Sequence, residues 1–132
     1  MRRLAAALLA AWPVLIPPAG AQAIPEAAEA FEQRQQDLVT LAGHLGTLHR
    51  LRQVCYPDDS PELFRRRLMT LIPLEVPMGA TRVRMIDAFN MQYRDTSREH
   101  ATCGRQARQD YALAAEAALG VTERLYAPFR SS

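Results

Sequence analysis

Apolar positions between residues 25 and 55 recur at helical spacing. Their separations are seven, three, four, three and seven residues, which keeps them on one side of a helix with 3.6 residues per turn. This seam consists of Phe31, Leu38, Leu41, Leu45, Leu48 and Cys55. Pro25 is acceptable in a first helical turn. The pattern predicts a long helix from Pro25 to Val54 with one apolar seam.

Two glycines interrupt the predicted first helix. Gly43 and Gly46 each weaken a helix by about 1 kcal/mol relative to alanine. Two interpretations are open: the glycines permit close approach of another backbone, or they mark a kink.

A turn and a shorter helix follow. The stretch Pro57-Asp58-Asp59-Ser60-Pro61 has turn composition, and Ser60, Pro61 and Glu62 suit an N-cap, a first-turn proline and a dipole-favoured acid. We predict a helix from here to about Ile72. Its apolar side carries Phe64, Leu68, Leu71 and Ile72. Arg65, Arg66 and Arg67 cover the remaining sides, because adjacent residues lie about 100° apart, and we interpret them as a solvated basic face.

Two further helices are predicted in the second half of the chain. Pro73, Pro77 and Gly79 form a connection, after which Thr81 caps a third helix that ends before His100. The predicted stripe of the third helix is Val83, Ile86, Phe89 and Tyr93. Thr102 or a neighbour caps a fourth helix from about Arg105 to Tyr126. Its inward positions are Tyr111, Ala114, Ala118 and Leu125.

The predicted fold class is all-α, a four-helix bundle. No window shows sustained strand alternation with hairpin turns, and the helices have bundle-like lengths and connections. One domain spans residues 24–132, with a frayed tail from about residue 128.

The first residues have the layout of a cleavable secretory signal peptide. Arg2 and Arg3 precede an apolar run from Leu4 to Ile16, and two small-x-small sites place cleavage after Ala21 or Ala23. An uncleaved anchor is the alternative, but the apolar run has about 13 residues where a span needs roughly 20. We therefore expect a periplasmic protein without a stable membrane span.

Charge argues against a nucleic-acid binder. The chain is formally +2, but Arg2 and Arg3 both leave with the predicted signal peptide, so the remaining charge is zero. A binder of nucleic acid needs a concentrated basic surface. All fixed side-chain cations are arginine, since the sequence contains no lysine.

The two cysteines, Cys55 and Cys103, are most simply one disulfide in an oxidising compartment. The loop-entropy model gives such a bridge about 4 kcal/mol. A metal or redox pair is the alternative, but no C-x-x-C spacing supports it.

Four ordered segments carry a family resemblance. They are Leu48-His49-Arg50-Leu51-Arg52-Gln53-Val54-Cys55, Phe64-Arg65-Arg66-Arg67-Leu68-Met69, Ala88-Phe89-Asn90-Met91-Gln92-Tyr93-Arg94 and Thr102-Cys103. From about Leu38 to Tyr126 the chain resembles an uncharacterised family of small exported alphaproteobacterial proteins with a domain-of-unknown-function label. The resemblance implies export, a helical fold and pairing of the cysteines, and implies no activity.

This chain departs from the family pattern at three places. Phe64 stands where tryptophan is usual, Met91-Gln92 where Arg-Gly is usual, and His100 where an aromatic residue usually precedes the second cysteine. These changes affect any site near Asn90 and Cys103.

Sequence motifs predict no cofactor, metal site or catalytic residue. His44 and His49 are five apart and diverge by about 140° on a helix, and the thiol of His100-x-x-Cys103 is expected to be in the disulfide. The sequence has no C-x-x-C-H haem motif, and no G-x-S-x-G or S-x-x-K nucleophile motif. We therefore expect no enzymatic activity.

One set of polar residues is a candidate binding patch for an anion or a peptide. It comprises His49, Arg52, Arg82, Asn90, Tyr93 and Arg94. Asparagine is poor inside helices, so Asn90 either faces a groove or makes a structural polar contact that fixes helix register.

Three functional hypotheses follow. The first is a non-enzymatic interaction module that binds an envelope protein or an anionic envelope component. The second is a helical bundle that binds a small molecule or lipid. The third is an envelope enzyme acting on cell-wall material, for which no nucleophile or acid pair is visible.

Overall fold

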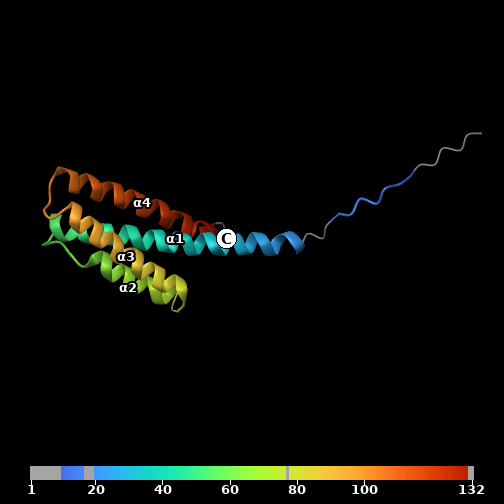
Figure 1. The fold of residues 1–132 in the computed structure, drawn as a ribbon, viewed down its shortest axis with the longest axis horizontal. Coiled ribbons are helices and arrows are strands. Elements are labelled where there is room, and N and C mark those ends of the chain that lie inside the picture. The colour runs from blue at the N-terminus through green and yellow to red at the C-terminus, as the bar shows by residue number, and fades with distance from the viewer. Residues whose placement is uncertain (1–9, 17–19, 77, 131–132) are drawn as a thin grey trace, which may run out of the picture.

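All regular secondary structure in the described part of the chain is helical. The computed structural model describes residues 10–16, 20–76 and 78–130, and within them contains four helices and no strand. The helices are α1 (Gly20–Cys55), α2 (Leu63–Glu75), α3 (Ala80–Glu99) and α4 (Arg105–Arg130) (Figure 1). The predicted fold class and the order of the elements are confirmed.

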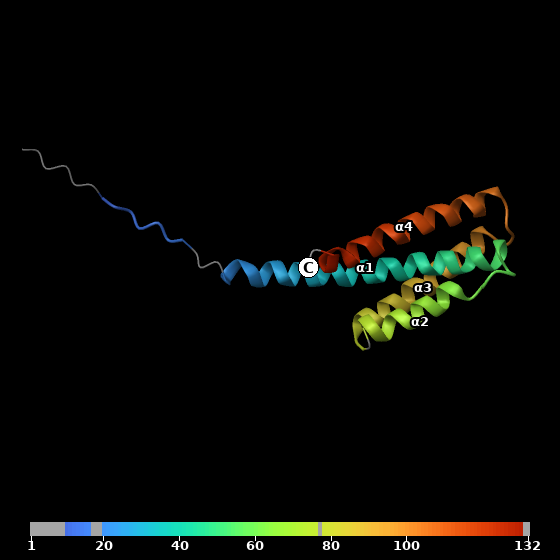
Figure 2. The same ribbon diagram turned by 180° about the vertical axis from the view of Figure 1, so that it is seen from behind.

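The helices are arranged around α1. In the described residues the close backbone contacts of α2, α3 and α4 are almost all with α1, and those three helices hardly approach one another. Figure 2 shows α1 as the long central element, with its N-terminal part extending beyond the others. The bundle is therefore centred on one helix, whereas in a regular four-helix bundle each helix packs on two neighbours.

The seam of α1 forms the floor of the core. Leu38, Leu41, Leu45 and Leu48 are all buried, as predicted, whereas Phe31 is 61% exposed because it lies near the end of the bundle. The other three helices contribute Leu68, Ile72, Met85, Phe89, Ala114, Ala118, Val121 and Leu125 to the same core.

Gly46 marks the closest approach of α1 and α3. A Cβ atom at this position would overlap the backbone carbonyl of Phe89, whereas a Cβ at Gly43 would make an ordinary contact with Gln92. The close-approach interpretation is confirmed for Gly46. No L-amino acid other than glycine fits there without moving a helix.

The predicted stripe of α3 is partly wrong. Val83 is 57% exposed, while Met85, Phe89 and Thr96 are buried. Because Phe89 is fixed against Gly46, the side of α3 that carries Met85 and Thr96 faces α1. Val83 lies in the first turn, on a different side from Met85.

The predicted caps of α2 and α3 are wrong. The residue before α2 is Glu62, without a side-chain cap bond, and Ser60 instead adopts a positive φ of 47° in the preceding turn. The residue before α3 is Gly79, with φ 97°, and Thr81 lies inside the helix. The left-handed conformation at Gly79 favours glycine, which explains why the chain turns there.

Three helix ends also lie outside their predicted positions. α1 begins at Gly20, so Pro25 is inside it; Pro73 lies in the last turn of α2; and α4 continues to Arg130 instead of fraying at Pro128. The Arg34 guanidinium lies over the Phe129 ring, 5.6 Å from its centroid, and this contact supports the last turn of α4.

The predicted disulfide is present. Cys55 at the end of α1 is bonded to Cys103 just before α4, with 4.9 Å between their Cα atoms. Much of the predicted signal peptide, residues 1–9 and 17–19, lies outside the described residues, and residues 10–16 have no regular secondary structure. Within the described ranges, none of the helices combines the length and the apolar character needed to cross a membrane.

Candidate functional site

The structure brings two residues of the predicted patch together, below the surface. His49 is buried on α1, and its ring centroid lies 5.4 Å from that of Tyr93 on α3. The Tyr93 hydroxyl donates to Gln53 Oε1 at 2.8 Å, and the Gln53 amide nitrogen lies 3.3 Å from His49 Nε2. This assignment makes Nε2 an acceptor, so the geometry favours a neutral imidazole.

Burial lowers the pKa of His49 below 6.5, and the nearby Glu62 carboxylate partly opposes this effect. The lowered pKa agrees with the acceptor role of Nε2, because protonation would place an N–H against the amide group of Gln53.

Arg52 lies in a different structural contact. Its Nε donates to the carbonyls of Asp59 and Ser60 at 2.8 and 2.9 Å, and its guanidinium donates to the Tyr111 hydroxyl at 2.9 Å. The guanidinium also forms an ion pair with the Asp59 carboxylate at 3.2 Å. Arg52 therefore ties the turn before α2 and the first half of α4 to α1.

The remaining patch residues are exposed on α3. Asn90 and Arg94 are four residues apart and share a side of the helix, whereas Arg82 lies in its first turn. The six predicted residues thus do not form one continuous surface, because His49 is buried and Arg52 is bonded to other groups. A binding role for Asn90 and the exposed arginines remains a prediction.

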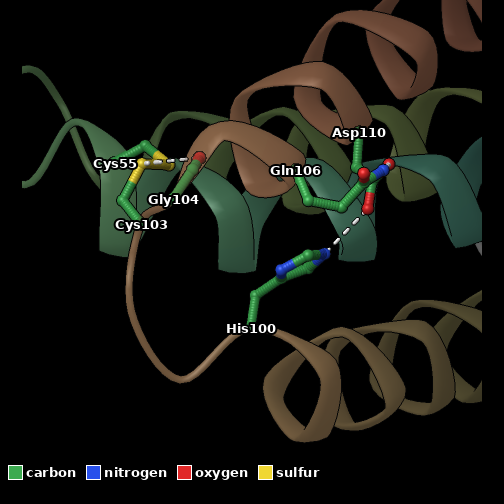
Figure 3. A network of polar contacts seen from close by, with 6 residues as sticks. All are labelled: Cys55, His100, Cys103, Gly104, Gln106 and Asp110. Atoms are coloured by element: carbon green, nitrogen blue, oxygen red, sulfur yellow. Dashed lines mark hydrogen bonds and ion pairs between the residues drawn. A yellow bond between two sulfur atoms is a disulfide. The ribbon is translucent and has the colours of Figure 1, made fainter.

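A histidine–aspartate pair beside the disulfide was not predicted (Figure 3). His100 Nε2 lies 2.7 Å from Asp110 Oδ2, and Gln106 donates to Asp110 Oδ1 at 2.8 Å. These two hydrogen bonds, that of Gln106 first, lower the pKa of Asp110. His100 directly follows α3, and Asp110 lies on α4. Because the two residues belong to different elements, helical spacing in the sequence does not reveal the pair.

The His100–Asp110 pair connects two helices. Its residues line a polar cavity of about 280 Å³ together with Asp95, Thr96 and Glu99. Among the described side chains, Asp110 is the hydrogen-bond partner of the His100 ring. A charge-relay site also needs a nucleophile on the other ring nitrogen, and no such contact accompanies this pair in the described residues. We interpret it as a structural contact between the α3–α4 loop and α4.

An apolar groove lies between α2 and α4, and we call it the α2/α4 groove. Its volume is about 540 Å³, and α1 forms its floor. It is lined by Leu41, Leu45, Leu48, Leu63, Phe64, Arg67, Leu71, Ala115, Ala118, Leu119 and Thr122. The groove exists because α2 and α4 both pack on α1 but do not pack closely against each other.

The α2/α4 groove has the chemistry of a binding site for apolar groups. Leu119 on its α4 wall is 59% exposed, and Arg67 is the only charged residue among those that line it. Grooves of this kind accept the apolar face of a helix or an acyl chain. Within the described residues, no group of three or more histidine, cysteine or acidic side chains is placed to hold a metal ion.

Comparison with known proteins gives one match. No curated protein and no solved structure matches the chain. Residues 33–129 match a family described as protein of unknown function, DUF2385, and this range includes α2, α3, all of α4 except Arg130, and α1 from Gln33 onward. The chain is therefore a member of the DUF2385 family.

Proposed function

We propose that the chain is an exported, periplasmic, non-enzymatic interaction module that binds an acidic amphipathic helix in the α2/α4 groove. The observation that carries this proposal is the groove itself, which is open, apolar and about 540 Å³ in volume.

The floor of the groove has the spacing that receives a helix. Leu41 and Leu48 are seven positions apart on α1, about 10 Å along the helix axis, and Leu45 lies between them. A docked amphipathic helix uses anchors at i, i+3 or i+4, and i+7, which span the same length. Two turns of a partner helix therefore match the length of the floor. They would contact the exposed lining residues Leu119 and Arg67, because the floor leucines themselves are buried.

The basic face of α2 selects an acidic partner. Arg67 lines the groove and has no carboxylate partner among the described residues, whereas Arg65 and Arg66 lie on another side of α2. Opposite charge at the edge of an interface steers association and suppresses wrong partners. A partner with carboxylates beside its apolar face complements this wall.

Export is supported by the N-terminal pattern and the disulfide. The arginine pair, the short apolar run and the small-x-small sites are typical of a signal peptide, and disulfides persist in oxidising compartments. The absence of common nucleophile motifs from the sequence supports a non-enzymatic role.

Site-specific crosslinking in the host tests the proposal. A photoreactive residue replaces Leu119, which lines the groove, and in a matched variant it replaces Leu113, which lies on the same helix at a similar exposure of 63% but does not line the groove. We expect a discrete adduct from position 119 and none from position 113. Sequencing the crosslinked peptide should identify an acidic amphipathic helix.

Two results would contradict the proposal. Equal adducts from both positions, or none from position 119, would mean that the groove binds no helix. A low-mass adduct from position 119 would instead support the second candidate, a small amphiphile whose anionic group pairs with Arg67. Native mass spectrometry of the purified protein would then show the same molecule bound.

A further inference from the structure

The inner side of α3 changes from apolar to polar toward the end of the helix. Met85 and Phe89 are buried on this side. The same side continues at spacings of three and four residues, but it then carries Gln92, Thr96 and Glu99. A helix that only packs on a core keeps apolar residues along its inner stripe. The end of α3 therefore presents hydrogen-bonding groups where packing alone would place leucine or valine.

These polar residues line the cavity of about 280 Å³ beside the His100–Asp110 pair. Its walls come from the last turns of α3, from Thr47 on α1 and from Asp110 on α4. Figure 3 shows His100 and Asp110 pointing toward one another from the loop and from α4. The cavity shares no lining residue with the α2/α4 groove, so an inference about it does not depend on the proposed function.

The Thr96 side chain is buried without a hydrogen-bond partner. It is 5% exposed, and its hydroxyl makes no hydrogen bond within the residues that the structure describes. Among those residues, the fully enclosed side-chain atoms that lack a partner are His49 Nδ1 and Arg50 Nε. The Thr96 oxygen is therefore not fully enclosed, and because this residue lines the cavity, the oxygen is open to a molecule bound there. Burying a hydroxyl without a partner costs free energy, which such a molecule would recover.

Three carboxylates make the cavity electronegative. Asp95, Glu99 and Asp110 line it, and its lining includes no arginine. Arg98 pairs with Asp95 at 2.7 Å, whereas the Glu99 carboxylate has no cationic partner in the described ranges. A concave surface lined by charges of one sign concentrates ions of the opposite sign.

The acceptors of the cavity suit an ammonium group. Such a group is a compact cation that donates three hydrogen bonds and accepts none. The hydroxyls of Thr47 and Thr96 and the amide oxygen of Gln92 are neutral acceptors, and Glu99 supplies a charge. The volume equals that of about nine water molecules at roughly 30 Å³ each, so the cavity has room for an ammonium group with a few carbon atoms.

We propose that this cavity binds a small organic cation that carries a primary ammonium group. The Thr96 hydroxyl accepts one of its hydrogen bonds, and the Glu99 carboxylate at the rim is its counter-ion. The His100–Asp110 pair keeps the loop after α3 next to α4, so the two sides of the cavity stay together.

A nuclear magnetic resonance titration tests this inference on protein purified in the form its host processes. We expect 1,4-diaminobutane to cause saturable shifts of the Thr96, Thr47 and Glu99 amide signals, with a Kd of about 0.1–1 mM. The uncharged analogue 1,4-butanediol has the same length and should bind at least about tenfold more weakly. Added sodium chloride should weaken the binding of the diamine, because salt screens the attraction.

Two substitutions and a matched control assign the binding to this cavity. Thr96→Val keeps the shape of the side chain but removes the hydroxyl, and Glu99→Gln removes the charge. Each should raise the Kd of the diamine at least about fivefold. Glu116→Gln removes an exposed carboxylate of α4 that does not line the cavity, and it should leave the Kd unchanged. Thermal denaturation establishes that each variant is folded.

Four results would overturn the inference. Equal binding of the diol and the diamine would mean that the cavity does not select a cation. The same shifts from calcium chloride at lower concentration would identify an inorganic cation instead. An equal loss of affinity in Glu116→Gln would show only general attraction to an acidic surface. The absence of saturable shifts with the diamine would mean that water alone satisfies the Thr96 hydroxyl.

Discussion

Gly46 is the position at which one added methyl group has the largest expected effect. Its α-carbon faces the Phe89 carbonyl across the α1–α3 contact. Gly46→Ala gains about 1 kcal/mol of helix propensity but forces the two backbones apart. We expect a net loss of about 2–3 kcal/mol in the free energy of unfolding, measured by urea denaturation.

Gly120 provides the matched control for this prediction. A Cβ atom at Gly120 in α4 would have nothing within 4 Å, so Gly120→Ala should raise stability by up to about 1 kcal/mol. Similar effects of the two substitutions would contradict the close backbone contact at Gly46.

His49 should make stability depend on pH near neutrality. Burial lowers the pKa of His49 in the folded state below 6.5, so the unfolded chain binds more protons at mildly acidic pH. The stabilisation is fully present above pH 6.5 and is lost as the pH falls through the folded-state pKa. We expect the free energy of unfolding to decrease from pH 7.5 to 5.5, and His49→Gln to reduce this decrease.

The pH dependence, not the absolute stability, is the readout for His49. Burial also lowers the pKa of His44, so H44Q/H49Q should remove more of the decrease than H49Q alone. An unchanged pH dependence in H49Q would show that the imidazole does not titrate differently in the folded and unfolded states.

At the scale of the helices, Arg52 connects elements that hardly contact one another directly. It bonds the turn before α2 through Asp59 and Ser60, and α4 through Tyr111, while its own backbone belongs to α1. We expect Arg52→Met to lower the free energy of unfolding by about 1–3 kcal/mol, measured by thermal or urea denaturation.

An exposed arginine gives the comparison for Arg52. Arg98 forms an ion pair with Asp95 on the surface of α3, and Arg98→Met should change stability by less than about 0.5 kcal/mol. Arg52→Lys should restore only part of the loss, because lysine keeps the charge but lacks the planar fork of donors. Equal effects at Arg52 and Arg98 would contradict the connecting role.

The helices were predictable from sequence because their apolar spacing is regular and their ends carry turn residues. The caps were less predictable. A serine before Pro61 suits an N-cap, but the bond from Arg52 to the Ser60 carbonyl holds this residue in a turn. In α3, either Val83 or Met85 can start an apolar stripe, and only the contact at Gly46 decides which side faces α1.

At the scale of the whole molecule, the site depends on the arrangement of the helices. Residues of three helices line the α2/α4 groove. No short sequence motif indicates that α2 and α4 leave a gap above α1. The predicted patch failed to form one surface for a related reason. Histidine and tyrosine suit a core as well as a site, and the buried His49 packs against the half-buried Tyr93.

The central position of α1 also has a consequence for biosynthesis. A ribosome completes this helix before any of its three partners, so the leucines from Leu38 to Leu51 initially have nothing to pack against. Cys103 emerges 48 residues after Cys55, when α2 and α3 are already complete. The nascent chain therefore presents a long apolar surface until its second half arrives, and a chaperone that shields α1 would protect the most aggregation-prone interval.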